Sequence, residues 1–386
     1  VHDRPIARHV DDSVTRVLLG REQVLRRARG FAPLPVRIPA PVDGILAVGG
    51  HLKNTVGLGV GHDFFVSQHI GDLDTTGSFN AFRRVIDDLG RLYEHEPTRV
   101  ACDEHPDYAS TRHARSLGPP VTSVQHHYAH IAGCLAENDV PPPALGLSWD
   151  GTGYGTDGTV WGGEFLLVDE GGNWSRMAHL RTFRLPGGEA AVKEPRRSAL
   201  GLLLERGDLS RFRAMTLPLF DSFTPEELRV LETTTRKGLN APVTSSMGRL
   251  FDAVSALLGL RFRTAFEGQS AMMLEWIADV SVTDPYPFGL VEPPSAYPPS
   301  PSSLITHHAS LQYDWAPTVD ALVADLCAGT KRETISARFH NTLVDMGLDA
   351  AHRAGLERVV LSGGCFQNAL LTERLVQRLR DEGFKP

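Results

Sequence analysis

The sequence is poor in cysteine and has no long hydrophobic run. Only four of its 386 residues are cysteines, and no two of them form a C-x-x-C pair. This argues against a disulfide framework and against a cysteine-based zinc site. No segment approaches the roughly eighteen apolar residues of a membrane helix, and the first residues lack the shape of a signal peptide. We therefore expect a cytoplasmic protein without a membrane contact.

Long runs of positive charge are also missing. The formal net charge is −7, so the sequence does not predict an extended nucleic-acid surface. It has no P-loop pattern G-x-x-x-x-G-K-S/T, no Rossmann G-x-G-x-x-G at a βα turn and no H-E-x-x-H. These absences argue against two common nucleotide sites and against a zinc protease. The hydrophobic content of 41% and charged content of 22% are typical of a globular protein with a sizeable core.

The chain divides into a basic front piece and two longer parts. Residues 1–41 carry many arginines and lead into the proline-rich stretch FAPLPVRIPAPV. We interpret 1–41 as a fragment of a separate module followed by an extended linker; a solvated basic face is the alternative. Residues 42–143 and 144–386 are interpreted as lobes I and II.

Both lobes begin with the same order of elements. In lobe I we expect strands at 45–50, 55–60 and 64–70, a helix from Ser78, and strands at 99–103 and 121–125. In lobe II we expect strands at 144–150, 159–170 and 174–186, helices over 193–278 and 319–354, and a strand at 358–364. The repeat predicts a duplicated mixed α/β fold. Lobes of this kind close over a nucleotide from opposite sides.

Two histidines near the middle of the chain have the spacing of metal ligands. His126 and His130 stand at positions i and i+4 of HHYAH, so on a helix their imidazoles project from the same face. Asp150 ends the apolar run 144–149, which predicts a carboxylate at the tip of a buried strand. The three side chains suit one divalent cation, iron or zinc. The alternative is a helix start with some histidines packed and others exposed.

Two glycine-containing turns occupy corresponding positions in the two lobes. Glycine lets backbone N–H groups approach phosphate oxygens without a clash, and a lysine adds a positive charge. The candidates are Gly49, Gly50 and Lys53 in the first turn, and Gly151, Thr152 and Gly153 in the second. Each turn taken alone also fits an ordinary hairpin, but their matched positions favour a nucleotide site.

Lobe II contains further candidates for binding a nucleotide or an anionic intermediate. Asp252 and Glu267 can accept ribose hydroxyls, with Gly268 allowing close approach, although both carboxylates also fit a helix surface. The other candidates are Gly363 and Gly364 at a strand-to-helix turn, and Lys193 and Arg196 at a helix start that also fits a solvated first turn. Cys365 has no adjacent base, and we interpret it as a packed thiol rather than a nucleophile.

Several motifs occur in a characteristic order along nearly the whole chain. They are HHYAH, SWDGTGYGTDGTVWGGE, SSMGRLFDAVSALLGL with FEGQSAMMLE, and LSGGCFQN. In this order they resemble the HypF carbamoyltransferase family of nickel–iron hydrogenase maturation. The front segments HDRPIARHVDDSVTR and LRRARGFAPLPV resemble the tail of that family's YrdC-like domain.

The resemblance implies a fold and a reaction. The fold would be a duplicated, actin-like (ASKHA) fold of two lobes, preceded by a fragment of a YrdC-like domain. Carbamoyl phosphate and ATP would give carbamoyl-adenylate in the YrdC-like domain. The two-lobed domain would then transfer the carbamoyl group to the C-terminal cysteine of a HypE-type partner, for later conversion to a cyanide ligand of iron.

The resemblance also assigns residues. His126, His130 and Asp150 match the family's metal ligands, whereas the 151–153 loop, Gly268, the Gly363–Gly364 pair and Asn368 match its nucleotide contacts. The family continues to an Asp-Gly-Gly segment that supplies a further metal carboxylate, and this chain ends at Pro386. We therefore expect a fragment that does not form carbamoyl-adenylate on its own.

Three other functions compete with this interpretation. An O-carbamoyltransferase for small-molecule hydroxyls usually carries its YrdC-like domain after the transferase lobes, whereas here the related piece comes first. A tRNA-modifying transferase is disfavoured by the acidic charge balance. An actin-like ATPase that grips a protein would not need His126 and His130, so a His130→Ala variant separates it from the enzyme.

Overall fold

The computed structural model of the chain consists of two compact units, Val1–Val140 and Pro141–Pro386. It describes all residues except 1–2, 4–7, 216 and 293–309. Each unit has its own hydrophobic core. Within the described residues, no helix is both long enough and apolar enough to cross a bilayer.

Unit 1 alternates short strands with three helices among its described residues. Its elements are β1 (Val14–Leu18), β2 (Arg21–Arg26), β3 (Pro35–Arg37), β4 (Ile45–Ala47), β5 (Gly57–Val60), β6 (Asp63–Val66), α1 (Thr76–Leu92), β7 (Arg99–Asp103), α2 (Ala109–Ser116), β8 (Val121–Val124) and α3 (His126–Glu137). β1 and β2 form an antiparallel hairpin. The other strands form one sheet in the order β3-β6-β5-β4-β7-β8.

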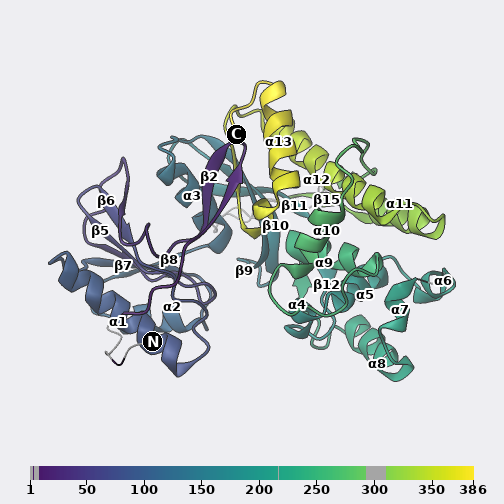
Figure 1. Ribbon diagram of the computed structural model, residues 1–386, viewed down its shortest axis with the longest axis horizontal. Coiled ribbons are helices and arrows are strands. Elements are labelled where there is room, and N and C mark those ends of the chain that lie inside the picture. Colours follow the sequence, from purple (N-terminus) through teal and green to yellow (C-terminus); the bar gives the residue numbers. More distant parts are fainter. Residues whose placement is uncertain (1–2, 4–7, 216, 293–309) are drawn as a thin grey trace, which may run out of the picture. The chain divides into compact units, whose positions relative to one another are not determined.

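The sheet of unit 1 combines a meander with parallel strands. β4, β5 and β6 are antiparallel neighbours, β7 runs parallel to β4, and β8 runs parallel to β7. α1 and α2 lie beside the sheet in Figure 1, and α1 packs Phe82, Val85 and Leu89 into the core. These residues follow the i, i+3, i+7 spacing of one helix face, which is why the segment folds as an amphipathic helix.

Unit 2 is larger and richer in helix. Its elements are β9 (Ala144–Tyr154), β10 (Val160–Val168), β11 (Trp174–Leu180), β12 (Phe183–Arg184), α4 (Ala190–Lys193), α5 (Pro195–Glu205), α6 (Leu209–Arg213), α7 (Pro218–Asp221), α8 (Pro225–Arg236), β13 (Val243–Thr244), α9 (Met247–Leu257), α10 (Gln269–Ile277), β14 (Gly289–Val291), β15 (Leu311–Asp314), α11 (Ala316–Cys327), α12 (Arg332–Ala354), β16 (Val359–Ser362), η1 (Gly364–Gln367) and α13 (Ala369–Asp381).

Unit 2 repeats the topology of unit 1. β9, β10 and β11 form an antiparallel meander, and β16 runs parallel to β9 as β7 does to β4. α5 packs beside α9, and α12 beside α13 (Figure 1). The strands bury large aromatic side chains in the core, among them Trp149 and Phe165, whose rings meet edge to face. The shared meander with its parallel neighbour agrees with the predicted duplication.

Two local predictions differ from the structure. The helix expected from Ser78 begins at Thr76 and is capped by Thr75. Ser78 is the third helical residue of a capping box, in which each side chain accepts a hydrogen bond from the other residue's backbone N–H. The stretch 1–41, interpreted as a module fragment and linker, contains strand β3, which pairs antiparallel with β6.

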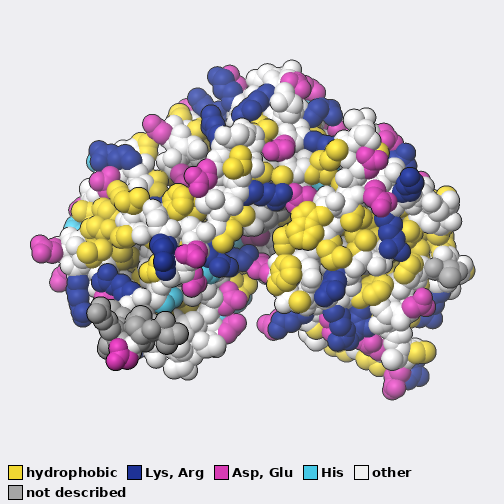
Figure 2. All heavy atoms as spheres, in the orientation of Figure 1, with side chains coloured by type: hydrophobic (Ala, Val, Ile, Leu, Met, Phe, Trp, Pro, Cys, Tyr) yellow, Lys and Arg dark blue, Asp and Glu magenta, His cyan; other side chains and the backbone are white. Residues whose placement is uncertain are grey.

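The visible surface carries both signs of charge. On the face drawn in Figure 2, Lys and Arg side chains are interspersed with Asp and Glu side chains. That mixture follows from a composition of 39 basic and 46 acidic residues. The expectation of no nucleic-acid partner stays a prediction.

A buried histidine joins α12 to the start of α13. The ring of His340 is fully buried; its Nδ1 donates to the carbonyl of Ser336 (2.7 Å) and its Nε2 accepts from the amide of Asn368 (2.9 Å). The amide oxygen of Asn368 accepts from the N–H of Leu371 and so caps α13. Asn368, which the resemblance assigns to nucleotide binding, therefore has a structural role, and its nucleotide contact stays a prediction.

We expect His340 to make the protein sensitive to acid. Burial lowers the pKa of His340 from 6.5 to about 4, because the charged ring would lose its hydration. Since the folded pKa lies below the unfolded one, the neutral buried ring contributes its full share of the folding free energy above pH 6.5. This contribution is lost progressively as the pH falls from 6.5 through about 4. The shift corresponds to about 3 kcal/mol of unfolding free energy. Urea unfolding of the wild type and His340→Gln between about pH 7 and pH 4.5 measures it.

The variant isolates the histidine because it removes the titration and keeps a polar side chain. His340→Gln is expected to be less stable at neutral pH but to lose much less stability on acidification than the wild type. His352→Gln is the control, since that side chain is 52% exposed. Equal acid sensitivity of the wild type and His340→Gln would contradict the prediction.

Candidate functional site

The HHYAH motif opens α3 as predicted. Gln125 caps the helix by accepting from the N–H of Tyr128 (2.9 Å). The rings of His126 and His130 lie on the same helix face with their centroids 4.9 Å apart, and both side chains are partly exposed. His127, between them, is buried. The motif thus separates into one packed histidine and a pair at metal-ligand spacing.

A buried carboxylate orients the first histidine of this pair. Nδ1 of His126 donates to Oδ2 of Asp103 at the end of β7 (2.9 Å), which fixes the orientation of the imidazole ring. Burial would raise the pKa of Asp103, but hydrogen bonds from His126 and from the N–H of His105 lower it below its ordinary value. A carboxylate behind a histidine is the usual outer partner of a metal-binding imidazole. The donor set of unit 1 therefore fits a metal ion.

The histidine pair shares a cavity with the first glycine turn. A cavity of about 320 Å³ within unit 1 is lined by Gly49 and Gly50 as well as by Asp103, His126 and His130. Its wall is mostly apolar, with these polar groups at a few places, which is the usual composition of a ligand pocket.

Lys53 lies in the same turn but is not among the lining residues. Its side chain is exposed, and its backbone N–H donates to Asp72 (2.8 Å). Asn54 closes the turn, because its buried amide donates to the carbonyls of Val48 (2.8 Å) and Gly50 (2.6 Å). The catalytic role of Lys53 stays a prediction.

In unit 2, β9 does not end at Asp150 as predicted. The strand continues to Tyr154 and turns at 155–158. Its pairing with β10 shifts, since Trp149 faces Gly163 and Gly153 faces Trp161. Residues 150–152 therefore form a bulge opposite one residue of β10. Thr152 is exposed on this bulge, whereas Gly153 is buried.

Backbone N–H groups hold the Asp150 carboxylate. Its Oδ1 accepts from the N–H of Gly151 (2.7 Å) and from the N–H of Gly364 (3.2 Å). The preceding Gly363 has φ +100°, and a Cβ there would lie 2.3 Å from the carbonyl oxygen of Trp149, so only glycine fits. The predicted glycine pair thus meets the predicted carboxylate.

The start of α9 packs against the same bulge. Ser246 caps the helix and donates to the carbonyls of Asp150 (2.9 Å) or Gly151 (2.8 Å). A Cβ at Gly248 would lie 2.8 Å from Cα of Gly151, so the two backbones touch because neither residue has a side chain. Three segments that are far apart in the sequence therefore converge in unit 2: 150–151, 246–249 and 363–364.

Asp252 lies one helical turn along α9 and is 4% exposed. It forms an ion pair with Arg249 (3.0 Å), and burial raises its pKa to about 6 although the guanidinium opposes this. Glu267 and Gly268 are exposed before α10, and Gly268 has the left-handed φ of +75°. The predicted ribose contacts of these residues remain predictions.

Arg196 has a different environment from the one predicted. Its side chain is 2% exposed, and its N–H groups donate to Glu194, Glu227 and the carbonyl of Ser222. These bonds engage all five donors of the guanidinium. These contacts give Arg196 a structural role. They do not support its predicted binding of an anionic intermediate. Lys193 is exposed at the end of α4.

Cys365 follows the glycine pair. Burial, together with the negative charge of Asp150, raises the pKa of its thiol well above the ordinary value. A thiol with a raised pKa is protonated at neutral pH and is a poor nucleophile. The interpretation of Cys365 as a packed residue agrees with this environment.

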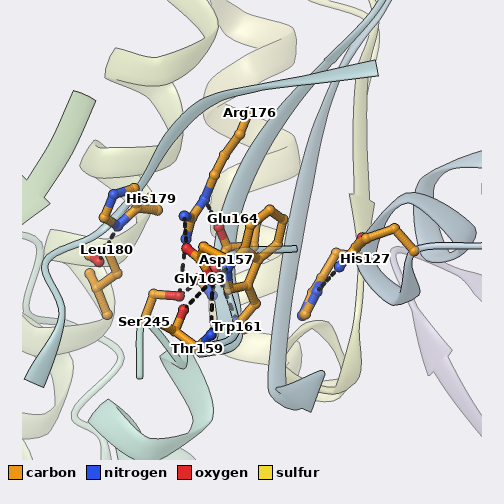
Figure 3. Close-up of polar contacts among 12 residues, drawn as sticks. His127, Asp157, Thr159, Trp161, Gly163, Glu164, Arg176, His179, Leu180 and Ser245 are labelled. Carbon is orange, nitrogen blue, oxygen red and sulfur yellow. Dashed lines mark hydrogen bonds and ion pairs between the residues drawn. The ribbon is translucent and has the colours of Figure 1, made fainter. Parts of the chain in front are cut away.

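A buried carboxylate ties β10, β11 and the residues before α9 together (Figure 3). Glu164 is fully buried and accepts from Oγ of Ser245 (2.5 Å), from Nε of Arg176 (2.6 Å) and from the backbone N–H groups of Gly162 and Gly163 in its own strand. Arg176 also donates to Asp157 (3.1 Å) and lies 3.9 Å from the ring centre of Trp161. Because Ser245 precedes Ser246, this network supports the segment that contacts the bulge.

Two family models match the chain in succession. Residues 40–137 match the HypF Kae1-like domain, and residues 146–386 match the second subdomain of the carbamoyltransferase Kae1-like domain. The chain belongs to the HypF carbamoyltransferase family. The resemblance inferred from its motifs is thereby confirmed.

HypF relatives align over the whole chain. The carbamoyltransferase HypF of Synechocystis sp. is 40% identical, with 100% of this chain and 50% of the relative covered. A carbamoyltransferase HypF homolog of Cupriavidus necator is 33% identical, with 88% of this chain and 85% of the relative covered. The chain spans about half the length of most of the curated HypF relatives it matches.

Solved HypF structures have the same fold. A crystal structure of full-length HypF in the phosphate- and nucleotide-bound form matches with a TM-score of 0.89 and 38% identity, over 99% of this chain and 48% of that one. The structure of HypF from T. kodakarensis matches with a TM-score of 0.84 and 27% identity, over 100% of this chain and 49% of that one. The predicted duplicated ASKHA fold is confirmed; the origin of residues 1–41 in a YrdC-like domain stays a prediction.

Motif reading missed two residues of the HypF chain that the structure brings to the candidate site. Asp103 ends a strand in ACDEHPDY, where nothing in the sequence places it near His126. Arg249 lies within the motif SSMGRLFDAV that the resemblance used, but no role was assigned to it.

Proposed function

We propose that the chain performs the carbamoyl-transfer step of HypF chemistry. The carbamoyl group of carbamoyl-adenylate passes to the C-terminal cysteine of a HypE-type partner. The thiolate sulfur forms a bond to the carbonyl carbon, the bond from that carbon to the phosphate oxygen breaks, and AMP leaves with the electron pair. The observation that carries the proposal is the His126–His130 pair, oriented by Asp103 in one cavity with the first glycine turn, in a chain of the HypF family.

We propose His126, His130 and Asp150 as the ligands of one divalent cation, iron or zinc. Imidazole nitrogens and a carboxylate oxygen suit either metal. Asp103 orients the imidazole of His126, and two backbone N–H groups fix Oδ1 of Asp150. When bound, such a cation would stabilise negative charge on a phosphoryl or carbonyl oxygen.

The glycine segments are proposed to hold the nucleotide. Short or absent side chains let a phosphate or a sugar approach the backbone. The segments with this property are Gly49 and Gly50 in unit 1, and residues 151–153, Gly268 and Gly363–Gly364 in unit 2. A related HypF structure was solved in a phosphate- and nucleotide-bound form. ATP and carbamoyl phosphate would enter the reaction as the source of the carbamoyl-adenylate.

The attacking thiolate is proposed to come from the partner. Cys365 in unit 2 has a thiol pKa raised by burial and by Asp150, so it does not suit the role of nucleophile. An external cysteine at a flexible protein terminus can reach a cavity that an internal side chain does not. The proposal therefore predicts a carbamoylated partner and not a carbamoylated enzyme.

Mass spectrometry of the partner tests this proposal. The chain is incubated with synthetic carbamoyl-adenylate and a HypE-type protein, and we expect the mass of one carbamoyl group on the tail cysteine, with release of AMP. A partner with the tail cysteine replaced by serine is the control and is expected to stay unmodified. Transfer to small-molecule hydroxyl compounds but not to the cysteine would instead support the O-carbamoyltransferase.

A further inference from the structure

Arg249 is a buried arginine at the start of α9 whose hydrogen bonds are incomplete. The residue is 7% exposed, and Nη2 forms an ion pair with Asp252 (3.0 Å). Nε and Nη1 are buried and have no hydrogen-bond partner among the described residues. Leaving charged donors unsatisfied in the interior is costly, so such groups are normally paired.

Two other arginines of unit 2 show what full pairing looks like. Arg196 uses all five of its donors on carboxylates and one carbonyl, and Arg176 donates from its three nitrogens to Glu164, Asp157 and Ser245. The fold therefore gives every nitrogen of these two guanidinium groups a partner within the protein. Arg249 differs because two of its nitrogens have no partner among the described residues.

The position of Arg249 indicates what kind of ligand this is. A Cβ built on Gly151 would lie 3.6 Å from Nη2 of Arg249, and Gly248 touches the backbone of Gly151. The guanidinium thus lies beside the bulge that carries Asp150 and the glycine segment proposed for the nucleotide. A positive group with unused N–H donors at this place is suited to an oxyanion, and guanidinium binds phosphate oxygens through charge-assisted hydrogen bonds.

We propose that Arg249 binds the phosphate of the nucleotide and offsets the negative charge that this phosphate gains when the carbamoyl group leaves it. The identity of the anion rests on the proposed function. Asp252 holds the guanidinium through Nη2, and Nε and Nη1 donate to phosphate oxygens. The phosphate of carbamoyl-adenylate becomes the dianion of AMP on transfer, so Arg249 interacts more strongly with the product-like transition state than with the substrate.

Calorimetric titration of AMP and adenosine into Arg249→Gln tests the proposal without any transfer reaction. The two probes differ only in the phosphate. We expect AMP to bind about 10- to 100-fold more weakly to the variant than to the wild type, because charge-assisted hydrogen bonds are lost. Adenosine is expected to bind both proteins equally, which also shows that the variant is folded.

Matched variants separate binding from folding and from net charge. Arg249→Lys keeps the positive charge with fewer donors, so an intermediate loss of AMP affinity is expected, and this variant replaces Arg249→Gln if the latter does not fold. Arg211→Gln removes a charge from a 48% exposed side chain and is expected to leave AMP binding unchanged.

Three results would overturn the assignment of Arg249. They are unchanged AMP affinity in both Arg249 variants, an equal loss for AMP and adenosine, and failure of the wild type to bind AMP. Failure of the proposed function has a separate signature, because the partner cysteine would stay unmodified while AMP binding still depended on Arg249.

Discussion

Replacing His130 with alanine is expected to abolish tight metal binding and carbamoyl transfer together. His126 and His130 lie one turn apart on α3 with ring centroids 4.9 Å apart, so removal of one ring leaves one of the two imidazoles proposed as metal ligands. Loss of an outer partner of a metal ligand costs about 10- to 100-fold in affinity, and loss of the ligand itself is expected to cost more than about 100-fold. Elemental analysis measures the metal content and chelator competition measures the metal affinity, while the transfer assay measures activity.

An outer-partner variant gives a graded comparison. Asp103→Asn keeps the shape of the side chain that binds Nδ1 of His126 but removes its charge, so about a 10- to 100-fold loss of metal affinity is expected. His352→Gln, at an exposed position, is expected to retain wild-type affinity. Normal metal content and normal transfer in His130→Ala would remove the proposed cation site. Unchanged ATP-driven partner binding by that variant would favour the actin-like module instead.

The fold could be predicted from the sequence because its signals are local. Alternating and continuous apolar runs placed the strands 99–103 and 121–124 closely, and the apolar face of Phe82, Val85 and Leu89 identified α1. The start of α1 was misplaced because Thr75 and Ser78 are both good capping residues and form one reciprocal box. Choosing between them requires the backbone conformation at residue 75.

The bulge at Asp150 and the role of Arg196 could not be predicted in the same way. β9 looks finished at Asp150, since glycine and threonine follow, but pairing with β10 resumes at Gly153. That continuation depends on a strand that lies later in the sequence. Arg196 has the local appearance of an anion-binding residue, and only the approach of Glu227 from α8 saturates it. A sequence motif identifies the type of a residue. Hydrogen bonds from distant elements decide whether its side chain can still bind a ligand.

Removal of the Glu164 side chain is expected to have the largest effect on stability. Glu164→Ala would remove the acceptor of the shortest hydrogen bond that the 15% exposed Arg176 side chain makes. It would also leave Ser245 Oγ and two backbone N–H groups without their acceptor (Figure 3). Breaking a buried ion pair by removing one partner costs about 3–5 kcal/mol. For a unit of this size we expect a fall of roughly 6–20 °C in melting temperature, measured by calorimetry.

An exposed ion pair provides the matched control. Arg236→Ala breaks an i, i+4 pair with Glu232 in which the arginine is 46% exposed, and such pairs contribute less than about 1 kcal/mol. Glu164→Gln keeps the size of the side chain and one acceptor oxygen, so an intermediate loss is expected. A melting temperature of Glu164→Ala equal to that of Arg236→Ala would show that the network does not hold this part of the fold together.

The Glu164 network is also expected to affect nucleotide binding at the bulge formed by residues 150–152. Glu164 binds Ser245, and the adjacent Ser246 donates to the carbonyls at Asp150 and Gly151, so the carboxylate acts on the bulge through two consecutive residues. If the bulge binds the nucleotide phosphate, Glu164→Gln should weaken AMP binding although Glu164 itself does not contact the ligand. In that case AMP, at the same concentration, should raise the melting temperature of Glu164→Gln less than that of the wild type, since the stabilisation by a ligand grows with the logarithm of its affinity.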